Sequence, residues 1–179
     1  MELIDFIQVY DDVLSEEECD HCIKLFEEGV GKQNYYTDVL KFTQYYLPDT
    51  LFTSSILNKI RDRQGDYCFN MCETLDCYGL WPQEVEFEPL KVKRYVPKRK
   101  EEFGRHIDVS DKENCARFLS CLVYLNDVEN GGQTVFNDVT IKPKVGRLIV
   151  FPPLWMFPHA GKPSISNPKY ILGTYLRFI

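Results

Sequence analysis

The chain has 179 residues and a mass of 21.0 kDa, which is the size of one typical domain. Hydrophobic residues make up 44% of it and charged residues 27%, which is ordinary globular usage and excludes a disordered, collagen-like or coiled-coil protein. The 21 Lys and Arg residues against 27 Asp and Glu residues give a net charge of −6, which argues against wholesale binding to nucleic acid or to an anionic membrane.

The cellular compartment is indicated by the N-terminal sequence and by the cysteines. The segment Met1–Ile7 contains acidic residues and no basic one, and no stretch reaches the roughly 18 apolar residues that a membrane span needs. Seven cysteines are an odd number in a chain large enough to fold without disulfides. We therefore expect a cytoplasmic protein with free thiols, no membrane partner and no clear nucleic-acid site.

The first part of the chain predicts helices. Ser15 and Glu18 form a capping box, and apolar residues then recur at helical spacing to about Glu28, after which glycines end the helix. A second helical pattern covers roughly residues 50–72, and the segment between the two helices has no clear pattern. We expect residues 1–80 to form a helical support region.

The second part of the chain changes to a period of two. Short apolar runs separated by Gly, Pro, Asn and Asp predict eight strands at residues 90–96, 105–109, 117–125, 134–136, 139–142, 147–151, 156–160 and 169–178. Strands of this number and spacing favour a jelly roll. We predict a mainly β fold with N-terminal helices (α+β), in which residues 1–179 are one domain and residues 81–179 form a double-stranded β-helix core.

A metal site is suggested by two of the three histidines. The period of two along a strand places His106 and Asp108 on the same side, so that an imidazole and a carboxylate reach one point. His159 lies in a later strand, and a jelly roll brings distant strands side by side. Two histidines and one carboxylate on one face form the facial triad that favours non-haem Fe(II) and leaves coordination positions open.

From Leu90 to its end the chain also resembles a known family, through several motifs in order. These are Val92–Tyr95, His106–Asp108, Cys121–Asp127, Gly131–Phe136, Gly146–Phe151, and His159–Pro163 followed by Lys169. They are similar to the motifs of the 2-oxoglutarate and Fe(II)-dependent dioxygenases, specifically the prolyl 4-hydroxylase catalytic-domain type. The resemblance implies a double-stranded β-helix enzyme that hydroxylates an unactivated C–H bond.

The resemblance also implies roles for particular residues. His106, Asp108 and His159 become the iron ligands, and Lys169, Tyr95 and Thr174 become residues that bind 2-oxoglutarate. The implied partners are O2 and a peptide, protein or small-molecule substrate, with peptidyl proline first, and L-ascorbate is implied as an accessory reductant. A buried lysine is consistent with this role because the distal carboxylate of 2-oxoglutarate would compensate its charge.

Three alternatives remain open at this point. Two histidines and an aspartate also suit a zinc-dependent hydrolase, although hydrolysis does not need a lysine that anchors a dicarboxylate. A non-catalytic jelly-roll binding module is the second alternative. The third is a structural zinc site at Cys19 and Cys22, where spacing on one buried helix face is the simpler explanation.

The segment 91–100 contains six basic residues and no acidic one. This composition is typical of a solvated hairpin. If the loop that follows Tyr95 overhangs the site, its positive charge would attract an acidic peptide or another polyanion.

Overall fold

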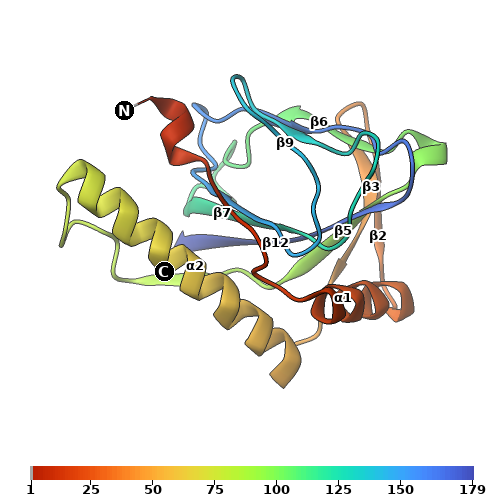
Figure 1. Ribbon diagram of the computed structural model, residues 1–179, viewed down its shortest axis with the longest axis horizontal. Coiled ribbons are helices and arrows are strands. Elements are labelled where there is room, and N and C mark those ends of the chain that lie inside the picture. The colour runs from red at the N-terminus through yellow and green to blue at the C-terminus, as the bar shows by residue number, and fades with distance from the viewer. Residues whose placement is uncertain (1) are drawn as a thin grey trace.

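The computed structural model describes residues 2–179 (Figure 1). Its helical elements are the 3-10 helices η1 (Leu3–Phe6) and η2 (Pro97–Arg99) and the α-helices α1 (Glu16–Glu28) and α2 (Leu51–Leu75). Its strands are β1 (Gln8–Tyr10), β2 (Gln33–Tyr36), β3 (Leu40–Tyr46), β4 (Val85–Phe87), β5 (Lys91–Tyr95), β6 (Glu102–His106), β7 (Arg117–Tyr124), β8 (Thr134–Val135), β9 (Thr140–Ile141), β10 (Leu148–Phe151), β11 (His159–Gly161) and β12 (Lys169–Phe178).

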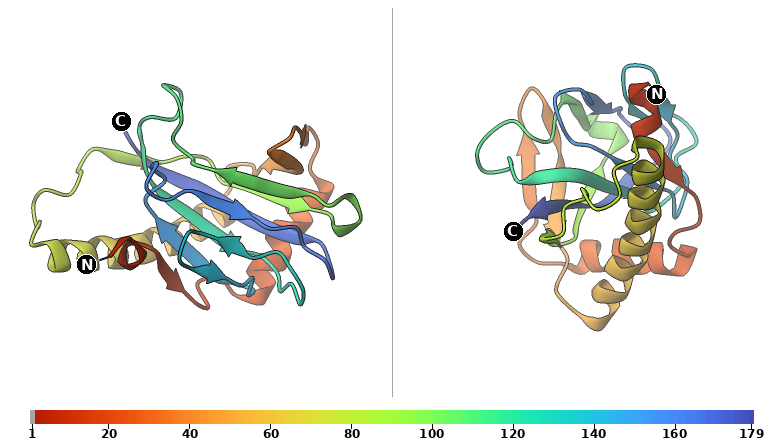
Figure 2. Two further views of the ribbon diagram at one scale, coloured as in Figure 1. Left: turned by 90° about the horizontal axis from the view of Figure 1, so that it is seen from above. Right: turned by 90° about the vertical axis from the view of Figure 1, so that its left-hand side faces the viewer.

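The strands form one antiparallel sheet that curls over itself. Their order is β1-β10-β7-β12-β5-β3-β6-β11-β8-β9, with β2 paired to β3 and β4 paired to β12. The curl brings β6 and β9 opposite the layer formed by β7, β12 and β5 (Figures 1 and 2). This arrangement confirms the predicted jelly roll with helices outside it, and each of the eight predicted strands has a counterpart.

The two helices begin and end close to the positions expected from the sequence. Ser15 Oγ accepts a hydrogen bond from the Glu18 backbone nitrogen at 3.3 Å, and the Glu18 carboxylate accepts one from the Ser15 nitrogen at 2.9 Å. This capping box supplies partners for backbone groups that the helix itself leaves unpaired. Helix α2 starts at Leu51 and continues three residues beyond the predicted end, to Leu75.

The expectation for residues 1–80 needs a correction, because this region also supplies three strands. Strand β1 pairs with β10 at one end of the sheet, while β3 lies between β5 and β6 within it. The pattern of β3 is hard to recognise because Thr43 and Gln44, which are polar, are buried in its middle. The period of two in apolar residues is therefore absent from a strand that is central in space.

Two apolar clusters lie on opposite faces of the sheet. We call the first the outer core; it joins the inward faces of α1 and α2 to outward-facing strand residues such as Val92 and Leu172. The second, the inner cluster, lies inside the curl and includes Tyr95, Phe151 and Ile171. No helix within residues 2–179 combines the length and the apolar character needed to cross a bilayer.

Candidate metal centre

Three predicted ligands meet inside the curl of the sheet. Strands β6 and β11 are antiparallel neighbours, and His106 faces His159 directly in their register. His106 Nε2 lies 3.4 Å from Asp108 Oδ1, and His159 Nε2 lies 3.6 Å from Asp108 Oδ2. Within residues 2–179, these three residues are the group of metal-binding side chains whose ligand atoms converge, all within 4.8 Å of one another.

The local structure around Asp108 differs from the expected one. Strand β6 ends at His106, so Asp108 lies beyond the strand and not two positions along it. The segment is held there by the neighbouring backbone, because the Val109 nitrogen donates a hydrogen bond to the Pro153 carbonyl at 3.2 Å. The carboxylate still reaches both imidazoles, so the predicted cluster forms by a different local route.

Both imidazole rings are oriented with one nitrogen toward the centre. The Nδ1 atoms of His106 and His159 lie 2.8 Å and 3.0 Å from the carbonyl oxygens of Gly104 and Phe157, which can only accept hydrogen bonds. These contacts assign the proton to Nδ1 and leave Nε2 free as a ligand atom. Because two local backbone carbonyls fix the rings, the orientation does not depend on the metal.

Unpaired polar atoms indicate that the cluster needs another partner. His106 Nε2 and Asp108 Oδ2 are buried without a hydrogen-bond partner in the described chain. The second oxygen of Asp108 accepts a hydrogen bond from the Tyr175 hydroxyl at 2.9 Å. Buried polar atoms are normally paired, so two unpaired ligand atoms aimed at one point fit a cation with nitrogen and oxygen ligands.

The protonation states also suit metal binding. Burial alone would raise the pKa of Asp108, but the adjacent side chains of His106 and His159 outweigh this and hold the pKa below its usual range. Burial lowers the pKa of His159, which favours the neutral imidazole. A carboxylate and neutral imidazoles are the forms that bind metals.

A cavity lies beside this cluster and is lined by its three residues. Lys169 lies close to it: the residue is buried, with its ammonium group 3.1 Å from the carbonyl oxygens of Gly132 and Lys162. No carboxylate in the described chain pairs with it. Burial and the charge of Lys93 lower the pKa of Lys169 to about 7. An uncompensated buried ammonium group favours an anionic ligand at this position.

Two glycines keep space around Lys169. A Cβ atom at Gly161 would lie 3.5 Å from Lys169 Nζ, in van der Waals contact with the ammonium group. Gly132 has a φ of +76°, a conformation that favours glycine, and a Cβ there would lie 3.3 Å from Lys169 Cδ. The residues present therefore fit a small dianion that reaches from the metal to Lys169.

The other two residues assigned to the cosubstrate have different positions. Tyr95 lines the cavity, and its ring lies 4.3 Å from the Lys169 ammonium group. The structure does not bring Thr174 there, because alternation along β12 places it on the face opposite Lys169. The Thr174 hydroxyl instead donates a hydrogen bond to the Glu88 carbonyl at 2.6 Å.

Sequence reasoning missed three polar residues of the cavity: Lys93, Thr134 and Tyr175. The period of two contains the signal for two of them, since Lys93 is two positions before Tyr95 on β5 and Tyr175 is six positions after Lys169 on β12. Thr134 gives no such signal, because it lies on the two-residue strand β8, where its backbone nitrogen donates a hydrogen bond to the Tyr124 hydroxyl. Only the curl of the sheet brings that strand to the site.

Comparison with known proteins agrees with this geometry. The sequence profile of the 2OG-Fe(II) oxygenase superfamily matches residues 90–177. No curated protein sequence matches the chain. All three ligand candidates, and Tyr95 and Lys169, lie within the matched segment.

Several solved structures share the fold. The viral collagen prolyl hydroxylase of Paramecium Bursaria Chlorella virus-1, solved as a 2OG complex, superposes with a TM-score of 0.75 at 24% identity, covering 97% of both chains. A prolyl-4-hydroxylase from Pseudomonas putida gives 0.71 at 16% identity, covering 99% of this chain and 97% of the other. A prolyl hydroxylase from Trichoplax adhaerens, solved with a hypoxia inducible factor oxygen degradation domain peptide fragment, gives 0.74 at 18% identity, covering 97% and 84%.

Proposed function

Because this chain belongs to the 2OG-Fe(II) oxygenase superfamily and is a 2-oxoglutarate-dependent hydroxylase, we propose that it hydroxylates a prolyl residue in a peptide. In this proposal His106, Asp108 and His159 hold the iron. Lys169 and Tyr95 bind the far carboxylate of 2-oxoglutarate. The observation that carries the proposal is the convergence of three ligand atoms beside a cavity flanked by an uncompensated lysine.

The chain's own residues would divide the work of catalysis. Bound Fe(II) supplies the redox chemistry that couples O2 to decarboxylation of 2-oxoglutarate and to hydroxylation. The backbone carbonyls of Gly104 and Phe157 keep both histidines oriented, and Tyr175 holds one carboxylate oxygen so that Asp108 presents the other. A ligand set that occupies one face leaves the opposite positions open for cosubstrate and O2.

Aromatic side chains would shield the reacting groups from water. The Phe103 ring stacks on His106 with centroids 3.4 Å apart, and the Phe151 and Phe136 rings lie 4.9 Å and 5.4 Å from His159. A dry site strengthens the electrostatic interactions in it and limits side reactions. The Lys169 ammonium group fixes the cosubstrate at one end, which orients its other end toward the metal.

The peptide part of the proposal is supported by the shape of the opening and by the relatives. A second, open cavity of about 450 Å³ continues outward from His106 and Asp108, past Thr37 and Val39 on one side and Asn114 on the other. An open cavity that leads to the cluster is consistent with a chain segment as substrate. The structures that share the fold include prolyl hydroxylases, and one of them holds a peptide fragment.

The test has two steps. Anaerobic titration of the Fe(II)-loaded protein with 2-oxoglutarate should give the weak visible charge-transfer band of the chelate, which should vanish in His159→Ala and require more cosubstrate in Lys169→Ala. Succinate release and a 16 Da mass gain should then follow addition of proline-containing peptides, but not of the same peptides with alanine in place of proline. Absence of the band in wild type would contradict the assigned site and would favour the alternative of a zinc hydrolase. A band without proline-dependent turnover contradicts the substrate alone.

A further inference from the structure

Five of the six basic residues in segment 91–100 fall into two groups with different surroundings, and the sixth, Arg94, pairs with Glu27. The residues at its end, Lys98, Arg99 and Lys100, are exposed on and after η2 and do not line either cavity of the site. Lys91 and Lys93 lie on β5, and both line the outer cavity together with His106 and Asp108. The positive charge that faces the metal centre therefore comes from the strand and not from the loop.

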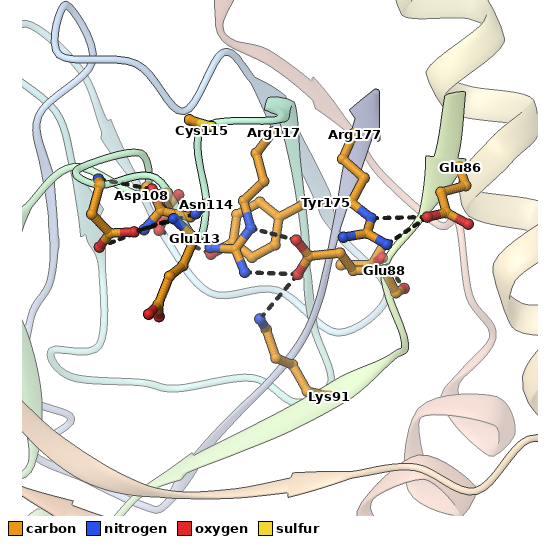
Figure 3. Close-up of polar contacts among 12 residues, drawn as sticks. Glu86, Glu88, Lys91, Asp108, Glu113, Asn114, Cys115, Arg117, Tyr175 and Arg177 are labelled. Atoms are coloured by element: carbon orange, nitrogen blue, oxygen red, sulfur yellow. Dashed lines mark hydrogen bonds and ion pairs between the residues drawn. The ribbon is translucent and has the colours of Figure 1, made fainter. Parts of the chain in front are cut away.

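The first of these lysines has a charged partner. Lys91 Nζ lies 3.8 Å from Glu88 Oε2, and Arg117 binds both oxygens of the same carboxylate. Figure 3 shows this group beside Tyr175, with the guanidinium of Arg117 and the ammonium of Lys91 on two sides of Glu88. Two cations share one carboxylate, so the group retains an excess positive charge.

Lys93 has no such partner. It is half-buried, and no hydrogen bond or ion pair of its ammonium group occurs among residues 2–179. The group lies 5.0 Å and 4.5 Å from the ring centroids of Phe42 and Phe103. Burial and the charge of Lys91 lower the pKa of Lys93 to about 7. Asp108, the carboxylate that shares its cavity, would be used by the metal.

We propose that Lys93, flanked by Lys91, receives a carboxylate of the substrate, so that the enzyme selects an acidic substrate. This inference rests on the proposed function, since it concerns the substrate of that site. Lys169 already serves the cosubstrate at the inner end of the cavity, and Lys93 stands nearer the open end. The carboxylate is either an acidic side chain near the hydroxylated residue of a peptide or the free acid of a small molecule.

The physical reason is the cost of a cation that is removed from water without a counter-charge. Such a group is stabilised strongly when an anion arrives, because the interaction takes place in surroundings of low dielectric constant. A neutral substrate would leave Lys93 unpaired and would seal it from water as well. The site therefore discriminates in favour of an anion and against its neutral analogue.

Binding is measured without turnover, using the Fe(II) holoenzyme with 2-oxoglutarate under anaerobic conditions. The probes are three peptide pools in which one proline is surrounded by Ala, Gly and Ser, with a single Glu, Gln or Lys placed at each of the six nearest positions. A second pair, N-acetylproline and N-acetylprolinamide, represents small molecules. Wild type should bind the Glu pool, or the free acid, at least about tenfold more tightly than the neutral partner. The arm that shows the preference identifies the source of the carboxylate.

Three variants complete the test. Lys93→Met should abolish the preference for the anionic probe, and Lys93→Glu should reverse it in favour of the Lys pool. Lys98→Met removes the same charge from the exposed loop and should keep the wild-type preference. If the preference changes with the charge at position 93 and not with the charge at position 98, a general effect of net charge is excluded. A reversed preference in Lys93→Glu also shows that this variant is folded, because an unfolded protein would not discriminate between the probes.

Two results would overturn the inference. One is equal binding of anionic and neutral probes by wild type, or a preference that persists in Lys93→Met. The other concerns the cosubstrate, whose affinity is measured from the charge-transfer band. If Lys93→Met lowers the affinity for 2-oxoglutarate more than it lowers the discrimination between probes, Lys93 serves the cosubstrate instead. Absence of the band in wild type would instead contradict the proposed function, so the two failures are distinguishable.

Discussion

Strands β5 and β12 present two faces that differ in nearly every physical respect. Their outward residues, such as Val92 and Leu172, are fully buried in the outer core against the helices. Their inward residues, such as Lys93, Tyr95 and Lys169, line or border a cavity and include two lysines without a carboxylate partner. One face of the same backbone provides stability, and the other holds charges that only ligands can satisfy.

This division explains how an unfavourable site is maintained. Unpaired buried charges lower the free energy of unfolding. Such charges persist only where the surrounding structure is stable enough to hold them in place. The long register of β12 with β7, and its pairing with β5 on the other side, supply that support. The two faces should therefore respond independently to substitution, which four experiments examine.

The largest effect is expected for Asp108→Asn on the inner face. The amide would lose the negative charge that both histidines face, so metal affinity and turnover should fall at least about 100-fold. Equilibrium dialysis of the metal and succinate release measure the two quantities. Asp111→Asn, in the neighbouring exposed turn, is the matched control and should bind metal like wild type. Comparable metal binding by the two variants would remove Asp108 from the site.

On the outer face, Leu172→Ala should lower the free energy of unfolding by about 2–5 kcal/mol, because the residue is fully buried and its removal leaves a void. Denaturant unfolding gives this value. The metal affinity of the folded fraction should stay within the error of the wild-type measurement. A parallel loss of metal affinity would show that the two faces are coupled.

Lys169→Met should stabilise the ligand-free protein while it weakens 2-oxoglutarate binding. The lysine has a pKa of about 7 when folded and an ordinary value of 10.5, so between these pH values the unfolded chain holds a proton that the folded chain lacks. Stability of the wild type therefore rises with pH across this window as the penalty disappears. The advantage of Lys169→Met should be largest near pH 7 and smaller at pH 9.5 in urea unfolding. An advantage that grows with pH would reverse the sign and contradict a depressed pKa.

The smallest effects come from two adjacent hydroxyl groups on β12. Tyr175→Phe removes the donor to Asp108 and should weaken metal binding about tenfold. Thr174→Val removes a hydrogen bond to a backbone carbonyl on the other face and should cost about 1 kcal/mol of stability with unchanged metal affinity. Metal affinity and the free energy of unfolding should be measured for both variants. Metal affinity should fall only in Tyr175→Phe, whereas Thr174→Val should lower stability alone. If Thr174→Val weakened 2-oxoglutarate binding, the placement of Thr174 outside the cavity would be wrong.

Much of the fold could be predicted because local signals agreed with it. The capping box at Ser15 and the alternation along the later strands were sufficient for the helices and the jelly roll. Strand β3 could not be predicted in the same way, because its two buried polar residues, Thr43 and Gln44, are accommodated only by strands far away in sequence. Such tertiary context overrides local preference.

The site shows the same limit. The three ligands were predicted from motifs. The backbone conformation that places Asp108 beside the histidines could not be predicted, because it depends on the hydrogen bond from Val109 to the Pro153 carbonyl, which residue spacing does not show. Thr174 was assigned to the cavity without regard to strand parity, which places it on the opposite face from Lys169. Applied consistently, that parity would have identified Tyr175 and Lys93. Thr134 needed the three-dimensional structure.

The length of β12 has a final consequence. Lys169 and Tyr175 are separated by six residues of regular strand, about 20 Å along its axis, and paired neighbours on both sides prevent the strand from stretching or slipping. The strand therefore holds the buried Lys169 ammonium group and the Tyr175 hydroxyl, which donates to Asp108, at a fixed separation. A substitution that shifts the register of β12 should consequently displace both groups together, although they lie far apart along the strand.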